Sequence, residues 1–401
     1  RPLRNSVKET ELVSVFFWVK FLNMNNYSNY IAIVGAGIAG LTLGNILKIN
    51  NIPCVIFEKS KNINEYGAGI SISSNGLKVL DSLKILDPLN NISSQPSQAS
   101  FFSNGKRIKN IPVNITTASR KNLYKLLLNK YLSLNGDIFF NYEVIDVKSD
   151  NKEIHFSNNQ KYNFSHIASC DGIKSICQRK ISTSFDNPKY SGYYVWRTIF
   201  KSNQKNIRFY LGPNHHVVTY PIDKERVSFI SAIKSKNQKH ESWRQEGSIK
   251  DLLFELPQSL ISMYPNIQNN NGVYKWGVYL RPNCNKLYDK NVTYLGDAAH
   301  PIVPFIGQGA CLALEDAFIF GQLLKKYSND YSLSQYKYNL LRIDRIRSIY
   351  TKSLHQGKLN HLSNPFLVYM RNLLMKYTNV INDRTKEIWS YDVRTIINKL
   401  E

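Results

Sequence analysis

The chain has 401 residues, of which 43% are hydrophobic and 20% charged, so a largely disordered chain is excluded and there is room for two domains. Lysine and arginine number 52 against 29 acidic residues, which gives a formal net charge of +23. The cations are scattered rather than grouped in blocks, so we expect no nucleic-acid partner, although the positive field would attract anionic substrates and phosphates.

The cysteines and the hydropathy of the sequence limit the cellular compartment that we expect for this chain. The five cysteines are odd in number and show no C-x-x-C spacing. This argues against a disulfide framework and favours a reducing, cytoplasmic compartment. No apolar run approaches the roughly 18 residues of a membrane span. We expect no metal site. Because the first methionine is Met24, we expect residues 1–28 to be an N-terminal extension, disordered or not native.

The first strong elements predict a β-α-β unit. Tyr30–Val34 and Cys54–Glu58 have the apolar character of buried strands, and Ile38–Ile49 has helical spacing of apolar residues. A glycine motif, G-A-G-I-A-G, fills residues 35–40 between the first strand and the helix. This is the position at which a dinucleotide-binding fold holds its pyrophosphate.

Each glycine of this motif has a physical task. Gly35 permits the tight turn, Gly37 lets a pyrophosphate approach the backbone, and Gly40 allows helix and strand to pack closely. Glu58 closes the second strand about 20 residues on, where a carboxylate binds ribose hydroxyls. The cofactor contacts predicted from this unit are Gly35, Gly37, Ile38, Ala39, Gly40, Glu58 and Lys59.

The predicted type of secondary structure changes twice in the middle of the chain. Ser74–Leu86 and Arg120–Leu134 are amphipathic, short alternating strands follow in Asp137–Phe156, and the strand Ile167–Cys170 ends in an Asp-Gly pair. From about residue 190 to 279 we predict a separate sheet. Its strands are expected at Tyr193–Phe200, Ile207–Leu211, Val217–Pro221 and Ser228–Ile233, with a helix at Ser242–Leu256.

A second motif follows the buried strand Val292–Leu295. Residues 295–301 read L-G-D-A-A-H-P and continue through Pro304 to G-Q-G-A at 307–310. Asp297 can bind a hydroxyl group of a ligand, and Gly307 and Gly309 leave backbone amides open to a ring system. The helix predicted at Gly309–Lys326 aims its positive end at that place, which suits an anionic group. A longer helix is expected at Ser332–Gln356, and the remainder is mostly helical.

These two motifs in this order resemble the single-component (group A) FAD-dependent aromatic hydroxylases, the group of salicylate and p-hydroxybenzoate hydroxylases. The resemblance runs from Asn29 to about residue 393. It departs from the family pattern at Gln178, where an arginine is usual; here Arg179 stands one place later. The resemblance adds predicted FAD contacts at Gly69, Ile70, Arg120, Asp171, Gly172, Gly296, Asp297, Pro304, Gly307, Gly309 and Ala310.

The fold implied is α/β: a Rossmann-type FAD-binding domain, a separate antiparallel-sheet substrate domain and a helical C-terminus. The expected ranges are 29–180 and 280–330 for the two parts of the FAD domain, 181–279 for the substrate sheet and 331–401 for the C-terminal helices. We expect a monomer or a homodimer.

The resemblance also implies the chemistry. NADH or NADPH reduces FAD, dioxygen forms a flavin C4a-hydroperoxide, and a small phenolic or carboxylated aromatic substrate is hydroxylated. His216 and Tyr220 are four residues apart on one predicted strand, so both side chains share a face. We predict that they and Pro304 are catalytic, with His216 or Tyr220 deprotonating the substrate.

Two alternatives remain open at the level of sequence. The same fold hosts isoprenoid epoxidases, quinone-pathway hydroxylases and tetracycline-inactivating monooxygenases, and the basic surface makes weak peripheral membrane association worth testing. The other alternative is a non-catalytic FAD-binding redox sensor.

Overall fold

The structure is a computed structural model that describes residues 27–61, 69–182, 186–237, 246–268, 272–282, 284–328 and 330–398. The predicted N-terminal extension lies outside these ranges except for its last two residues. Residues 67–68, just before the predicted FAD contact Gly69, and residues 242–245 of a predicted helix also lie outside them.

The first domain is built on a six-stranded sheet with β1 near its centre. The strand order is β17 (Tyr288–Asp289), β18 (Val292–Tyr294), β11 (His166–Ser169), β1 (Ile31–Val34), β2 (Cys54–Glu58) and β7 (Asp137–Phe140). All neighbours pair in parallel except β17, which is antiparallel. Strands β1, β2 and β11 are apolar and buried along almost their whole length, as parallel strands covered on both faces require. The predicted β-α-β unit is confirmed.

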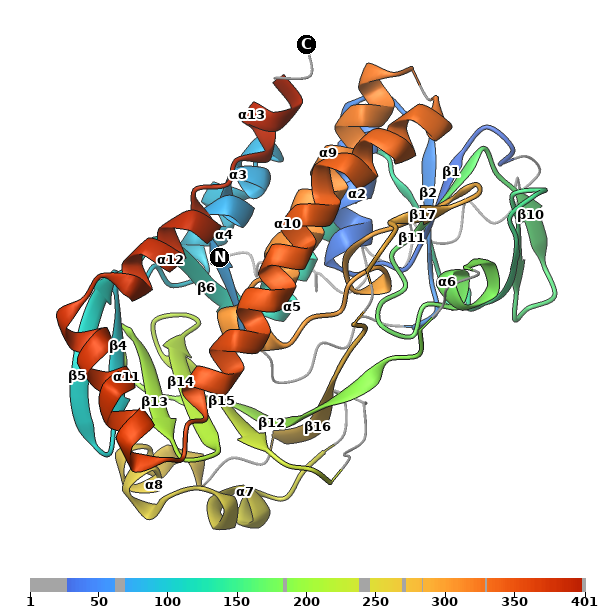
Figure 1. The fold of residues 1–401 in the computed structure, drawn as a ribbon. Coiled ribbons are helices and arrows are strands. Elements are labelled where there is room, and N and C mark those ends of the chain that lie inside the picture. The colour runs from blue at the N-terminus through green and yellow to red at the C-terminus, as the bar shows by residue number, and fades with distance from the viewer. Residues whose placement is uncertain are drawn as a thin grey trace, which may run out of the picture.

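A seven-stranded sheet forms the second layer (Figure 1). Its order is β16 (Val273–Leu280), β12 (Lys189–Lys201), β15 (Arg226–Lys234), β14 (His215–Pro221), β13 (Ile207–Gly212), β4 (Gln98–Ser103) and β5 (Lys106–Pro112). Two of these strands, β4 and β5, come from inside the range 29–180. They join through a parallel pairing of β4 with β13, so two distant stretches of the chain build this sheet.

Smaller elements connect and cover the sheets. The helices are α2 (Ile38–Ile49), α3 (Ser74–Ser82), α4 (Leu86–Asn91), α5 (Arg120–Ser133), α6 (Ile176–Ile181), α7 (Ile249–Glu255), α8 (Gln258–Met263) and α9 (Gly309–Lys326). The remaining strands are the pair β3 (Gly69–Ser73) and β6 (Ile115–Ser119), and the small sheet of β8 (Val144–Lys148), β9 (Glu153–Phe156) and β10 (Lys161–Asn163). Single 3₁₀ turns lie at Pro265–Ile267, Gly296–Ala298 and Pro304–Ile306.

The C-terminal region is helical, as predicted. It comprises α10 (Tyr331–Asn360), α11 (Pro365–Tyr377), α12 (Val380–Trp389) and α13 (Val393–Asn398). Helix α10 runs from the first domain to the seven-stranded sheet, and α11 and α12 return along the outer edge formed by β4 and β5 (Figure 1). Within the described ranges, no helix combines the length and apolarity needed to cross a membrane.

One close approach fixes the β3–β6 ribbon against the seven-stranded sheet. A Cβ added at Gly69 would lie 2.5 Å from Cβ of Ser228 and 2.8 Å from a ring carbon of Tyr220. Only glycine tolerates this distance without a backbone shift. The two domains therefore meet directly at this glycine.

A buried cluster of charges joins α9 to α10. The Arg342 guanidinium lies 2.7 Å from Glu315 and 2.8 Å from Asp316, and all three side chains are fully buried. Arg345 adds a second contact to Glu315 at 3.2 Å. Burial alone would raise the pKa of Asp316, but His300 and Arg342 outweigh it and hold that pKa at about 2. Two arginines thus neutralise two adjacent acids away from water.

We expect Arg342→Met to lower the free energy of unfolding by about 3–5 kcal/mol, because it leaves two buried carboxylates without their main cation. The matched control is Arg347→Met, an exposed arginine on the same helix, which should change stability by no more than about 0.5 kcal/mol. Chemical denaturation of both variants measures the difference, and equal losses would contradict the role assigned to the cluster.

Candidate functional site

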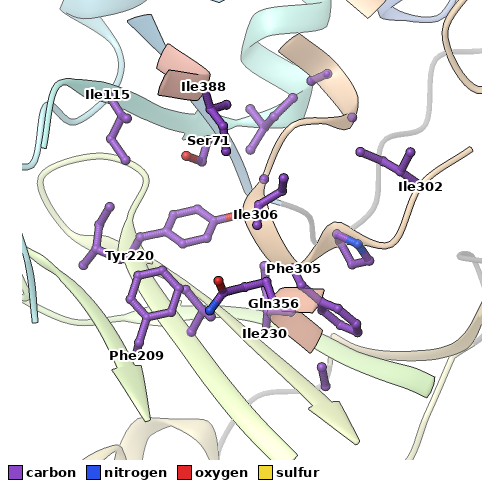
Figure 2. A pocket seen from close by; sticks show the side chains of 18 of the residues that line it. Ser71, Ile115, Phe209, Tyr220, Ile230, Ile302, Phe305, Ile306, Gln356 and Ile388 are labelled. Atoms are coloured by element: carbon purple, nitrogen blue, oxygen red, sulfur yellow. The ribbon is translucent and has the colours of Figure 1, made fainter. Parts of the chain in front are cut away.

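One cavity of about 620 Å³ lies between the two sheets and the C-terminal helices. Figure 2 shows Phe209 and Tyr220 reaching into it from the seven-stranded sheet, Gln356 from α10, and Ile306 from the loop before α9. Four arginines line the cavity and Asp297 is its one acidic lining residue within the described part of the chain. These arginines are Arg120, Arg197, Arg371 and Arg384. The balance favours an anionic ligand.

The first glycine motif has the geometry of a phosphate cradle. Gly35 adopts φ +100°, and a Cβ there would lie 2.5 Å from the Cys170 carbonyl oxygen. A Cβ on Gly40 would come within 1.9 Å of the Gly35 oxygen. Gly37 differs, because a Cβ there would meet no heavy atom of the described chain within 4 Å. The space in front of Gly37, at the start of α2, is therefore open to a bound group.

Six predicted cofactor residues do not line the cavity. Three of them are glycines, Gly35, Gly40 and Gly296, and the other three are Glu58, Lys59 and Asp171. The Glu58 carboxylate accepts hydrogen bonds from the backbone N–H groups of Ala36 and Ser60, both at 2.9 Å, and so holds the glycine loop. Lys59 is exposed. Asp171 accepts from the N–H of Ile176 at 2.8 Å and thereby caps α6. Their contacts with the cofactor stay predictions.

The loop of the second motif, residues 295–310, is held by the buried charge cluster on the side away from the cavity. Asp316 accepts from the Gly296 N–H at 3.0 Å and lies 2.5 Å from Nε2 of His300. Gly307, with φ +65°, and Gly309 would both place a Cβ in open space. The loop thus presents a smooth backbone surface and the N-terminus of α9 to the cavity, as a flat ring system requires.

Asp297 projects from this loop into the cavity. Its side chain is accessible through the cavity, although it lies deep in the protein. This depth raises the pKa of Asp297, while His300 and Arg120 oppose the rise. Arg120 begins α5 and lines the same cavity, so the two predicted residues are brought together.

Strand β14 places both predicted catalytic side chains on the cavity wall. His216, Val218 and Tyr220 line the cavity, while Val217 and Thr219 face the other side, where Val217 joins the core beneath α7 and α8. The strand alternation predicted this shared face. Burial raises the pKa of the Tyr220 hydroxyl, with Arg197 acting in the opposite sense, so Tyr220 is a neutral hydrogen-bond donor at neutral pH.

His216 has a partner that sequence reasoning missed. Its Nδ1 lies 2.6 Å from Nε2 of His361, in the turn after α10. Burial lowers the pKa of His216 to about 3 and that of His361 to about 2, so both rings are neutral. The two residues are 145 positions apart, and no local pattern connects them.

The hydrogen bonds around this pair favour one tautomer. Among the described residues, Nδ1 of His361 has no hydrogen-bond partner. A buried lone pair without a partner costs less than a buried N–H without one. His361 therefore carries its proton on Nε2 and donates to His216. This leaves His216 protonated on Nε2, the nitrogen available to the cavity, as a donor rather than the acceptor expected from sequence.

The structure also adds lining residues that the sequence did not single out. Arg197 stands at the wall with its guanidinium 5.1 Å from the centre of the Trp276 ring, and Phe209 stacks on Phe101 at 4.7 Å. Strand alternation could have selected Arg197 and Phe209 once the cavity face was known. Gln356 could not be selected, since α10 carries many polar residues. The predicted residues that do line the cavity are Gly37, Ile38, Ala39, Gly69, Ile70, Arg120, Gly172, His216, Tyr220, Asp297, Pro304, Gly307, Gly309 and Ala310.

Comparison with known proteins agrees with this geometry. Residues 29–337 match the family described as FAD binding domain. The chain is 25% identical over 380 residues to 3-amino-4-hydroxybenzoate 2-monooxygenase of Streptomyces cremeus, covering 90% of this chain and 94% of that protein. It is 24% identical over 368 residues to 3-hydroxybenzoate 6-hydroxylase of Klebsiella oxytoca, covering 86% and 91%.

Solved structures share the fold. A salicylate hydroxylase substrate complex aligns with a TM-score of 0.78 at 17% identity, covering 92% of this chain and 97% of that one. HpxO of Klebsiella pneumoniae, complexed with FAD and uric acid, aligns with a TM-score of 0.77 at 20% identity, covering 90% and 96%. The predicted FAD-binding fold is confirmed, and FAD is the cofactor that the open glycine cradle accommodates.

Gly37→Ala separates cofactor binding from folding. Because its new Cβ would meet no protein atom within 4 Å, we expect the apoprotein to unfold at an unchanged temperature while FAD affinity falls at least about tenfold. Gly40→Ala, whose Cβ would strike the Gly35 oxygen, should destabilise the apoprotein as well. Flavin titration and thermal unfolding measure both effects; full FAD affinity in Gly37→Ala would place the pyrophosphate elsewhere.

The neutral His216–His361 pair makes stability depend on pH. Below about pH 6.5 the unfolded chain binds a proton at His361 that the folded chain does not. The contribution of His361 to stability is therefore complete above that pH and falls by about 1.4 kcal/mol per pH unit as pH drops, and His216, whose pKa is also lowered by burial, adds a similar slope. His361→Gln, whose amide can still donate to His216, should flatten this slope by about that amount. The exposed His355→Gln on α10 is the control; an identical slope in both variants would refute the neutral pair.

Proposed function

This chain belongs to the FAD-binding domain family, and from that premise we propose that it is an FAD-dependent monooxygenase that hydroxylates a small aromatic substrate. The observation that carries the proposal is the shared cavity. Its wall combines the loop of Asp297 and residues 304–310 with His216 and Tyr220 of the seven-stranded sheet. A ring lying against this loop would therefore lie within the same enclosure as a substrate held by β14.

The cofactor-binding residues divide into two groups. The cradle of Gly35, Gly37 and Gly40 would hold the pyrophosphate, and Asp297 with the backbone at Gly307 and Gly309 would hold the ribityl chain and ring. FAD, when bound, supplies the redox and oxygen chemistry, with NADH or NADPH as the proposed reductant. The protein supplies the enclosure that keeps water away from the reacting centre.

The polar groups of the wall suit a phenolic or carboxylated ring. His216 offers an N–H and Tyr220 a hydroxyl, and the positive charge of Arg197 stands beside Tyr220. Two donors and a cation stabilise a phenolate oxygen or a carboxylate. We therefore assign His216 and Tyr220 to binding the ionised oxygen, which lowers the pKa of a bound phenol. Pro304, at the start of the turn beside them, shapes the wall.

The first test is substrate-stimulated turnover by the FAD-loaded protein. Oxidation of NADH and of NADPH, oxygen uptake and hydrogen peroxide are followed against a panel of hydroxybenzoates, hydroxynicotinates and phenols. We expect one compound to stimulate oxygen uptake with little peroxide. FAD binding without stimulation by any aromatic compound would favour an isoprenoid or quinone substrate, or a redox sensor, over the proposed function.

The donor assignment predicts a pH effect. Tyr220→Phe and His216→Asn should each reduce hydroxylation by about 10- to 100-fold, because each removes one hydrogen bond to a charged oxygen. The pKa of the bound phenol should rise, so the rate should increase only at higher pH than in the unchanged enzyme. His215→Asn alters the neighbouring histidine, which bonds the Pro213 carbonyl instead, and should leave the profile unchanged. An unmoved profile in all three variants would overturn the assignment.

A further inference from the structure

Helix α11 carries a stripe of exposed apolar side chains. Phe366, Tyr369 and Tyr377 are 68%, 60% and 71% exposed, and their spacing places them on one side of the helix. The opposite side is held down by buried Met375 and by buried Arg371, which donates to the Ser103 hydroxyl at 3.1 Å. A helix whose outer side faces water usually presents polar residues on that side. This helix is apolar on its outer side.

The stripe continues into the cavity. Leu374 and Val380 line the cavity, yet they are 54% and 50% exposed at the surface. Leu359, Met375 and Ile381 line the same end. Most side chains at this end are apolar, although Arg371 and Arg384 also line the cavity there. The cavity therefore reaches the surface between α10, α11 and α12 through a mainly apolar opening, which suits a molecule with an apolar body and an anionic group.

Basic residues are present on α11 and on the elements next to it. Strand β5 contributes Lys106, Arg107 and Lys109, and Lys109 donates to the Thr378 carbonyl just after α11. Lys358 lies in the last turn of α10, and Lys376 lies in the last turn of α11 itself. Residues 106–112 and 358–380 contain no acidic residue. In Figure 1, α11 lies beside β5 at the outer edge of the molecule, where this surface can meet a flat partner.

We propose that α11 and β5 form a membrane-docking surface that rests on an anionic lipid bilayer and opens the cavity toward it. An aromatic and aliphatic stripe bounded by cations matches the apolar interior and negative surface of such a bilayer. A second copy of this chain fits less well, because a two-fold contact would bring the two sets of cations together. The docking does not depend on the proposed reaction, so either can fail alone.

Sedimentation of the FAD-loaded full chain with vesicles tests the proposal. We expect binding to vesicles of phosphatidylcholine mixed with phosphatidylserine, weaker binding at physiological than at low salt, and little binding to phosphatidylcholine alone. Replacement of Phe366, Tyr369 and Tyr377 by serine together should abolish binding while leaving FAD content and thermal unfolding unchanged. Lys106→Glu with Arg107→Glu should weaken binding about fivefold or more for each charge removed.

Matched substitutions on other elements test whether binding depends on α11 and β5 or on any exposed aromatic or basic residue. Phe254→Ser removes a 91% exposed aromatic residue from α7, and Lys325→Glu with Lys326→Glu reverses two exposed charges at the end of α9. Both should bind vesicles nearly as well as the unchanged chain. The proposal is overturned if the protein binds no vesicle at low salt or if the serine triple variant still binds anionic vesicles. It is also overturned if the triple substitution prevents self-association of the chain and leaves vesicle binding unchanged.

Discussion

The buried contact of Arg342 with Glu315 and Asp316 is the interaction on which the site depends. Taking these charges out of water is costly, so each must be paired, and the pairing fixes the relative position of α9 and α10. The same Asp316 carboxylate holds Gly296 and His300 of the loop that precedes α9, while Arg345 reaches the Ile388 carbonyl of α12. One neutral cluster thus sets the loop at one end of the cavity and the helices at the other.

The wall opposite this loop is positioned by packing rather than by charge. Gly69 lets β3 press against Ser228 and Tyr220, and His361 fixes the ring of His216 from behind. Both of these cavity-lining side chains, His216 and Tyr220, are therefore held by groups outside β14. The third side of the cavity, toward α11 and α12, combines aliphatic side chains with Arg371, Arg384 and Trp389.

Local rules explain what the sequence could predict. Local backbone geometry requires Gly35, with its positive φ, and Gly40, whose Cβ would strike the Gly35 oxygen, while Gly37 follows from the spacing of the motif. Strand alternation alone gives the shared face of His216 and Tyr220. Contacts between residues far apart in the chain have no such local pattern in the sequence. The joining of β4 to β13, the contact of His216 with His361 and the pairing of Asp316 with Arg342 connect residues far apart in sequence. The apolar spacing of α11 predicts a helix but does not tell whether its apolar side faces a core or the surroundings.

The strand order of the first sheet has a consequence for the newly synthesised chain. Strand β1 emerges early, its neighbour β11 only at residues 166–169, and the next strand β18 only at residues 292–294. Until β18 leaves the ribosome, β11 remains an open edge of a hydrophobic sheet, a state prone to pairing with other chains. The loop of Asp297 and residues 304–310 follows β18 in the chain, so it cannot join the glycine motif of residues 35–40 before β18 is made. Chaperones therefore have most to protect in the interval between the synthesis of β11 and that of β18.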